Sequence, residues 1–266
     1  MPNLGIVVDA DACIPERIRT DLGILSAPLH APLLEGNETV MDLRHDADPP
    51  DPDAVAAACV RAAEESDTVL YVTVTDGNDD GAAARAAAAV GARARVVHYP
   101  SGDALMACGW QAIAAAVAAR DTASAGHACE TAQEAARAAA NRVHVLAMLE
   151  HPERMNVGGA LGGLRRRRAL VRLRGGDVEV IDRVAGRGDA LVSLRDSFAE
   201  EAAAGEGYLR VAVHHAGAAA AADAMMRWVE QELSPEEIVI APLTRHAAAR
   251  FGPGMLAFAW YREPRS

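Results

Sequence analysis

The chain has 266 residues, of which 51% are hydrophobic and 24% are charged, a composition that excludes wholesale disorder and fits one large or two smaller cores. Its formal net charge of −11 disfavours nucleic-acid binding, because an acidic protein repels a phosphate backbone. No stretch approaches the roughly 20 uninterrupted apolar residues of a membrane-spanning helix, and the first residues lack the pattern of a secretion signal. We therefore expect a cytoplasmic protein.

In the first half of the chain, short runs of β-branched residues alternate with long Ala-rich stretches. This pattern is typical of strands separated by crossover helices, and it predicts a parallel sheet. Pro15 and Pro52 suit the first turn of a helix, where a missing N–H costs nothing. Strands are expected at 4–8, 68–75 and 95–99, and helices at 15–22, 53–65, 81–90 and 104–120.

The second half begins with a helix at 129–140 and a strand at 143–148, after which the pattern changes. Two strands at 169–174 and 178–183 are joined by Gly175-Gly176-Asp177, which is a hairpin signal. Further helices are expected at 189–204 and 218–233, and further strands at 209–214, 238–242 and 255–261.

These elements predict an α/β protein with two domains. Residues 1–141 form an N-terminal domain with a parallel sheet and flanking helices. Residues 142–266 form a C-terminal α/β domain with a mixed sheet, because its hairpin pattern differs from the crossover pattern before it.

Cysteine and lysine usage narrows the possible chemistry. The four cysteines are widely separated, so we expect buried thiols and neither a metal site nor a disulfide framework. The chain contains no lysine, which excludes a Schiff-base mechanism and a Walker-type phosphate loop. We expect no cofactor.

Polar residues and glycines follow the expected strands of the first domain. They include Asp9 and Asp11, then Thr75-Asp76-Gly77, then Ser101-Gly102-Asp103. Ligands of an open parallel sheet bind beyond the carboxyl ends of its strands, so these residues are candidates for a site. Three interpretations remain open for the carboxylates here and at Asp46: helix N-caps and solvated loops, a divalent-cation site, or anion binding through neighbouring amides and Thr75.

Several segments resemble the DegV family of fatty-acid-binding proteins. Residues 6–15 (IVVDADACIP) are similar to its IVTDSTADLP start, residues 72–77 (VTVTDG) to ITLSSG, and residues 249–254 (ARFGPG) to its AHTGPG ending. Leu149-Glu150, 182–187 and 211–216 resemble the LEYL, EKVRGR and VAILHA segments in the same order. The resemblance covers nearly the whole chain.

The resemblance implies a non-catalytic protein whose two domains enclose a ligand cleft for an acyl chain. Loop hydroxyls and amides of the first domain would hold the carboxylate, and an acyl kinase subunit would be the partner that phosphorylates it. The proposed binding residues for a fatty acid or related amphiphile are Thr75, Asp76, Gly77, Ser101 and Arg250.

The chain departs from the family at its polar segments. Asp76 stands where the family has a serine, Arg250 where it has a histidine, and 46–50 (DADPP) where it has TSQPS. Asp76 disfavours an anionic head group, whereas Arg250 offers a carboxylate a bidentate partner that stays charged. Four arginines at 165–168 replace apolar residues of the family's lid.

These departures leave two alternatives to a lipid carrier. The acidic loops are consistent with a metal-assisted enzyme or a cation-binding protein. Alternatively, the chain is a diverged regulatory protein without a lipid pocket, which docks a partner through the arginines at 165–168.

Overall fold

The computed structural model describes residues 4–31, 33–34, 51–74, 81–122, 125–155 and 168–265. The chain divides into two compact units, each of which is described by itself. Unit 1 comprises Met1–Pro32 and Pro49–Val143, and unit 2 comprises Leu33–Asp48 and His144–Ser266.

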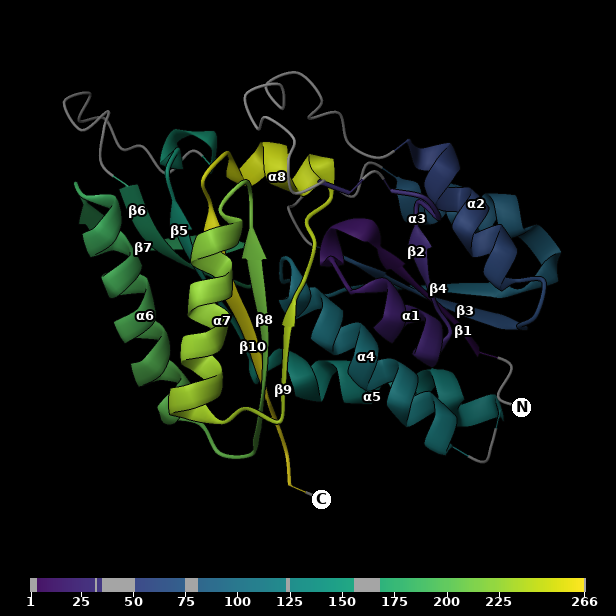
Figure 1. The fold of residues 1–266 in the computed structure, drawn as a ribbon. Helices are drawn as coiled ribbons and strands as arrows, with labels where there is room; N and C mark the ends of the chain where they lie inside the picture. Colours follow the sequence, from purple (N-terminus) through teal and green to yellow (C-terminus); the bar gives the residue numbers. More distant parts are fainter. Residues whose placement is uncertain are drawn as a thin grey trace. The chain divides into compact units, whose positions relative to one another are not determined.

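Unit 1 is built on a parallel four-stranded sheet with the order β2-β1-β3-β4 (Figure 1), which confirms the parallel sheet that the sequence predicts. In its register, Val8 of β1 lies opposite Ser26 of β2 and Val72 of β3, so the carboxyl ends of the strands meet at one edge. The strands are β1 (Leu4–Asp9), β2 (Ile24–Ala27), β3 (Thr68–Thr73) and β4 (Arg95–Pro100).

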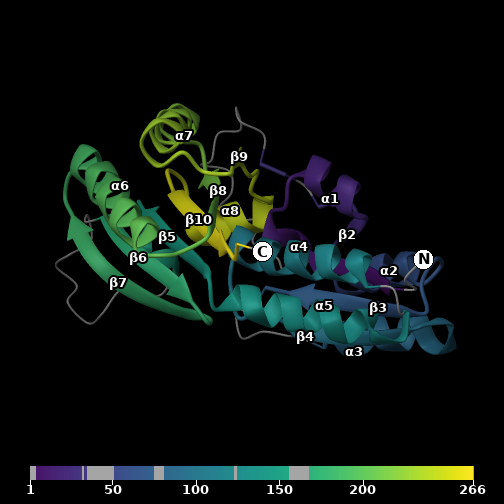
Figure 2. The same ribbon diagram turned by 90° about the horizontal axis from the view of Figure 1, so that it is seen from below.

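The helices of unit 1 pack against this sheet. One set forms a core with β1 and β3, in which Val7 and Tyr71 meet Val55 and Cys59 of α2 and Val90 of α3. The other set includes α4 and α5, which pack against each other and contact β1 (Figure 2). The helices are α1 (Glu16–Leu22), α2 (Pro52–Ala62), α3 (Ala82–Val90), α4 (Met106–Asp121) and α5 (Ala125–Ala140).

Unit 2 contains a mixed six-stranded sheet with the order β7-β6-β5-β10-β8-β9. β5 with β6, β6 with β7, and β8 with β10 are antiparallel, whereas β8 and β9 are parallel, which confirms the predicted mixed sheet. The expected hairpin closes where Arg174 pairs with Asp177. The strands are β5 (Val143–Leu149), β6 (Arg168–Arg174), β7 (Asp177–Val184), β8 (Tyr208–His215), β9 (Glu237–Ile240) and β10 (Leu256–Glu263).

Two long helices, α6 (Arg187–Ala203) and α7 (Ala219–Leu233), cover one face of this sheet (Figure 1). The core beneath them contains Phe198 of α6 stacked on Phe258 of β10, with ring centroids 4.2 Å apart. A short helix α8 (Arg245–Phe251) precedes β10, and a 3-10 turn η4 (Pro152–Met155) follows β5. Among the described helices, none has the length and apolar character needed to span a membrane.

Candidate functional site

The carboxyl edge of the unit 1 sheet contains a bonded carboxylate. Asp9 ends β1, and its Oδ1 accepts a hydrogen bond from the Tyr71 hydroxyl at 2.5 Å. Its Oδ2 accepts from the backbone N–H of Val74 at 2.9 Å. Asp9 therefore joins the end of β1 to the chain that leaves β3. Next to it, the Thr73 hydroxyl and His98 Nε2 lie 2.9 Å apart, which links β3 to β4.

Ser101 and its neighbours form a buried polar network at the end of β4. The Ser101 hydroxyl donates to the carbonyl of Asp103 and accepts from its N–H, both at 3.2 Å. The Gln111 amide donates to Asp103 Oδ2 at 2.8 Å, and its Oε1 accepts from the Tyr99 hydroxyl at 2.9 Å. The Ser101 hydroxyl thus shapes the turn that leads into α4.

Two thiols lie close to this edge. Burial, and to a lesser degree the charge of Asp9, raises the pKa of the Cys59 thiol to about 12. Burial also raises the pKa of Cys108, although a hydrogen bond to Ser101 opposes the shift. Both side chains are therefore protonated near neutral pH and behave as small apolar groups.

The remaining predicted residues of this edge lie outside the described part of the chain. These are Thr75, Asp76 and Gly77, together with Asp46 of the acidic loop. In the described part, the structure contains no group of three or more His, Cys, Asp or Glu side chains arranged to hold a metal ion. Both carboxylate oxygens of Asp9 already accept hydrogen bonds from the protein.

Arg250 lies in unit 2, in the last turn of α8. The helix begins at Thr244, whose hydroxyl accepts from the N–H of Ala247 at 3.0 Å, and it ends where Gly252 adopts a positive φ of 85°. Arg250 is half-buried, and its guanidinium carbon lies 5.8 Å from the centre of the Phe251 ring. The structure thus places Ser101 in unit 1 and Arg250 in unit 2.

The turn after α8 packs against charged residues from two other segments. The Arg154 Nη1 donates to the carbonyl of Ala249 at 2.7 Å. Glu150, only 13% exposed, forms ion pairs with Arg187 at 2.6 Å and with Arg168 at 2.5 Å. Arg168, the one described member of the arginine run, also donates to the carbonyl of Ala185 at 2.7 Å. The charge of Arg168 is therefore paired with that of Glu150 within the protein.

Each of the two histidines at the end of β8 has its own hydrogen-bond partner. His214 is fully buried, and its Nδ1 lies 3.1 Å from the carbonyl of Ala241. Burial lowers the pKa of His214 to about 3, so the ring is neutral at physiological pH. His215 is half-buried and accepts from the N–H of Ala218 at 3.4 Å, and burial also lowers its pKa.

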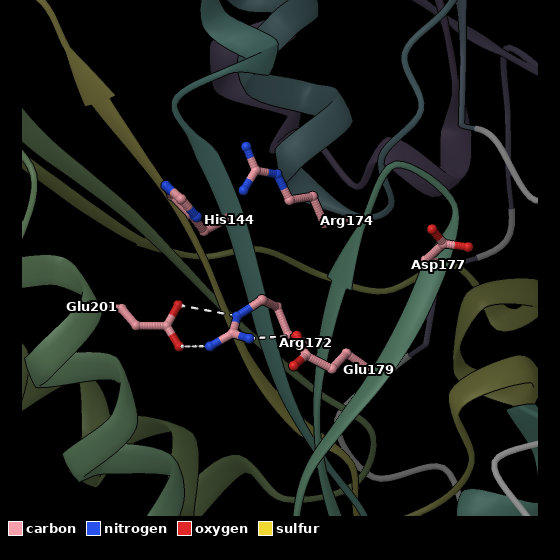
Figure 3. A pocket seen from close by; sticks show the side chains of 6 residues that line it. All are labelled: His144, Arg172, Arg174, Asp177, Glu179 and Glu201. Carbon is pink, nitrogen blue, oxygen red and sulfur yellow. Dashed lines mark hydrogen bonds and ion pairs between the residues drawn. The ribbon is translucent and has the colours of Figure 1, made fainter.

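A cavity of about 660 Å³ in unit 2 is lined by polar side chains from β5, the β6-β7 hairpin and α6 (Figure 3). Arg172 lies between Glu201 and Glu179 and forms an ion pair with each at 2.5 Å. His144 stacks on Trp260 with ring centroids 5.0 Å apart, and burial followed by the charge of Arg174 lowers its pKa. This cavity contains no predicted site residue, and its charged lining is unsuited to an acyl chain.

A family profile and several solved structures match this chain over nearly its whole length. The family profile described as "Uncharacterised protein, DegV family" matches residues 3–263. No curated protein has a matching sequence.

Solved structures of similar fold come from several bacteria. A DegV family protein of Thermus thermophilus, described by its fatty acid binding, is 21% identical with a TM-score of 0.76, covering 98% of this chain and 99% of that one. DegV of Bacillus subtilis, described as a fatty acid binding protein, is 17% identical with a TM-score of 0.77, covering 99% and 100%. A stearic acid-binding protein of Eubacterium ventriosum is 14% identical with a TM-score of 0.72, covering 97% and 98%. At these identities the likeness establishes a shared fold.

Proposed function

Because this chain belongs to the DegV family, we propose that it binds a fatty acid or a related amphiphile without transforming it. The observation that carries this proposal is a family match over nearly the full length, joined to the same two-unit fold in proteins described as fatty acid binding. The acyl tail supplies most of the affinity, since each buried methylene contributes about 0.8 kcal/mol. A chain of 12 or so methylenes therefore contributes on the order of 10 kcal/mol.

Arg250 is the proposed partner of the carboxylate head group. Its guanidinium presents a planar fork that matches two carboxylate oxygens. Its place in the last turn of α8, directly before a turn with two positive-φ glycines, supports this role because the bonds of that turn hold the end of the helix. Thr75, Asp76 and Gly77 complete the proposed head-group set.

Ser101 has a secondary place in this proposal. Its hydroxyl both donates to and accepts from Asp103, so a ligand would have to compete with a bond already made.

Asp76 opposes the head group directly, because two like charges about 4 Å apart cost roughly 4 kcal/mol at an effective dielectric constant of about 20. The positive charge of Arg250 offsets that cost.

We propose that the bound carboxylate is presented to an acyl kinase subunit, which the resemblance to the family implies. Incubation of the loaded protein with ATP and a fatty acid kinase should yield an acyl phosphate trapped by hydroxylamine as a hydroxamate. Equal hydroxamate from kinase and fatty acid without this protein would contradict presentation.

Binding itself is tested in two steps. Mass spectrometry of organic extracts of the purified protein should detect an amphiphile at about one per chain, whereas an empty extract followed by no binding of C12 to C18 fatty acids would refute the proposal. Arg250→Glu should then weaken binding of palmitate at least tenfold while binding of its uncharged methyl ester changes little, because only the acid presents a carboxylate. Arg195→Glu on α6 makes the same charge change away from α8 and serves as the matched control.

A further inference from the structure

We propose that Glu150, Arg154 and Arg187 are positioning residues for Arg250, which hold the end of α8 and the turn at 252–254 in the conformation that offers the guanidinium to an anionic head group. This inference rests on the proposed function, because it concerns the same carboxylate. None of the three residues is assigned to ligand contact. They act on the backbone on either side of position 250.

Arg154 contacts the backbone on both sides of Arg250, at Ala249 and at Gly252. Its Nη1 donates to the carbonyl of Ala249 at 2.7 Å, so the last turn of α8 has a side-chain partner for a carbonyl near its end. A Cβ at Gly252 would lie 2.9 Å from Arg154 Cδ and 3.4 Å from its Nε, so the arginine stem packs directly on that glycine. Because Gly252 also has a φ of 85°, both space and conformation require glycine there.

Glu150 and Arg187 hold the far side of the turn. A Cβ at Gly254 would lie 2.6 Å from Glu150 Cγ and 3.3 Å from Arg187 Nη1, so the turn is seated on this ion pair. The pair is 2.6 Å long, and Arg168 completes it on the other carboxylate oxygen at 2.5 Å. The N–H of Gly254 donates to the carbonyl of Ala216 at 2.7 Å, which ties the same turn to the end of β8.

The ion pair of Glu150 with Arg187 is part of a larger group of charged side chains. Arg168 and Arg187 both pair with the Glu150 carboxylate, whereas Arg154 donates to the carbonyl of Ala249 and the neighbouring Glu153 lies 3.2 Å from His151. The three arginines are therefore bonded within the fold, which suits residues that position a turn.

The sequence alone does not identify these contacts, although three of the segments involved resemble family motifs. Glu150 and Arg187 belong to segments that resemble family motifs, and the third such segment contains the turn itself. In the structure these three separate stretches converge on one turn. Arg154 belongs to none of them, and it is found only because η4 packs against α8.

The test measures discrimination between a charged and an uncharged head group. Palmitate and methyl palmitate are titrated into wild type, Arg187→Met and Arg154→Met, and the ratio of the two Kd values is compared. We expect this ratio to fall about tenfold in both variants, because loss of a supporting contact misaligns the group that it supports. Arg187→Lys and Arg154→Lys, which keep a charged donor, should recover part of the ratio.

The outcomes separate this inference from the proposed function. Arg172→Met, which removes an ion-paired arginine of the same unit away from α8, is the control and should leave the ratio unchanged. If wild type binds neither compound, the proposed function is wrong and this inference fails with it. If wild type discriminates and the folded Met variants discriminate equally well, the positioning role alone is wrong. Should a Met variant unfold, the same two titrations are made with Glu150→Gln. A lowered ratio in that variant supports the positioning role, and an unchanged ratio contradicts it.

Discussion

The Tyr71 hydroxyl donates a hydrogen bond of 2.5 Å to Oδ1 of Asp9, across the pairing of β3 with β1. The two residues are 62 positions apart in the chain, so this bond is a tertiary contact at the carboxyl edge of the sheet. The other carboxylate oxygen of Asp9 accepts from the N–H of Val74. The Asp9 side chain therefore links the carboxyl ends of β1 and β3.

Replacing either partner should destabilise unit 1. Tyr71→Phe leaves Asp9 with a missing donor and should lower the free energy of unfolding by about 1–2 kcal/mol, and Asp9→Ala, which loses both bonds, by about 2–3 kcal/mol. Urea unfolding measures both, and the double variant should lose less than the sum because the two residues share one bond. Strictly additive losses would contradict the coupling.

The buried His214 predicts a dependence of stability on pH. Its pKa of about 3 in the folded protein lies below the ordinary 6.5, so the unfolded chain binds more protons below pH 6.5. Stability is therefore complete above pH 6.5 and is lost as the pH falls from 6.5 towards 3. At pH 5 the loss is about 2 kcal/mol, from a difference of about 1.5 pH units.

His214→Asn isolates this contribution, because asparagine retains a donor for the carbonyl of Ala241 and does not titrate. The change in unfolding free energy between pH 7 and pH 5 should be smaller in the variant by about 2 kcal/mol. His215 and His144 remain in both proteins, so their own lowered pKa values cancel in the comparison. Identical pH dependence in the two proteins would contradict the assignment.

Gly109 lets α4 approach the turn that follows β1. A Cβ there would lie 2.7 Å from Met106 Sδ, 2.9 Å from Ile14 Cγ1 and 3.1 Å from the carbonyl oxygen of Ala12. Gly109→Ala should therefore cost about 1–3 kcal/mol of stability, measured by thermal or urea unfolding. Gly188→Ala on α6 is the matched control, since nothing lies within 4 Å of its Cβ. That substitution should be neutral or stabilise by up to about 1 kcal/mol.

The four thiols should differ in their reactivity with an alkylating reagent. Cys13, Cys59 and Cys108 are buried, and burial raises the pKa of the last two, whereas Cys129 is partly exposed. Mass spectrometry of the native protein at pH 8 should detect one rapid modification, and Cys129→Ser should abolish it. All four sites should react in urea. Rapid native labelling of Cys59 would contradict its burial.

Most of the architecture follows from sequence patterns that local chemistry dictates. The parallel sheet of unit 1 and the hairpin of unit 2 were predictable because crossover helices and a Gly-Gly turn leave clear signatures. β2 and α8 were not predicted. β2 has four residues between a helix and Pro28, too few to display alternation, and α8 is a seven-residue helix in a stretch whose apolar residues suit either state.

The candidate site was less predictable, because its geometry depends on contacts between distant segments. The sequence singled out Ser101 from its position after a strand, and the structure gives its hydroxyl a local partner in Asp103. Arg250 was singled out from the resemblance of residues 249–254 to the family's AHTGPG ending, in which it replaces a histidine. The support from Glu150 and Arg154 arises only when η4 packs against α8, which no local pattern predicts.

The residues that pack α8 into the core are not the residue that is proposed to bind the ligand. Ala247, Ala248, Ala249 and Phe251 are buried, whereas the side chain at position 250 between them is only half-buried. A substitution at this one position therefore alters charge or size without disturbing the helix core. Under the proposed function, position 250 would be a single adjustable point for redirecting the protein from acids to neutral or cationic amphiphiles.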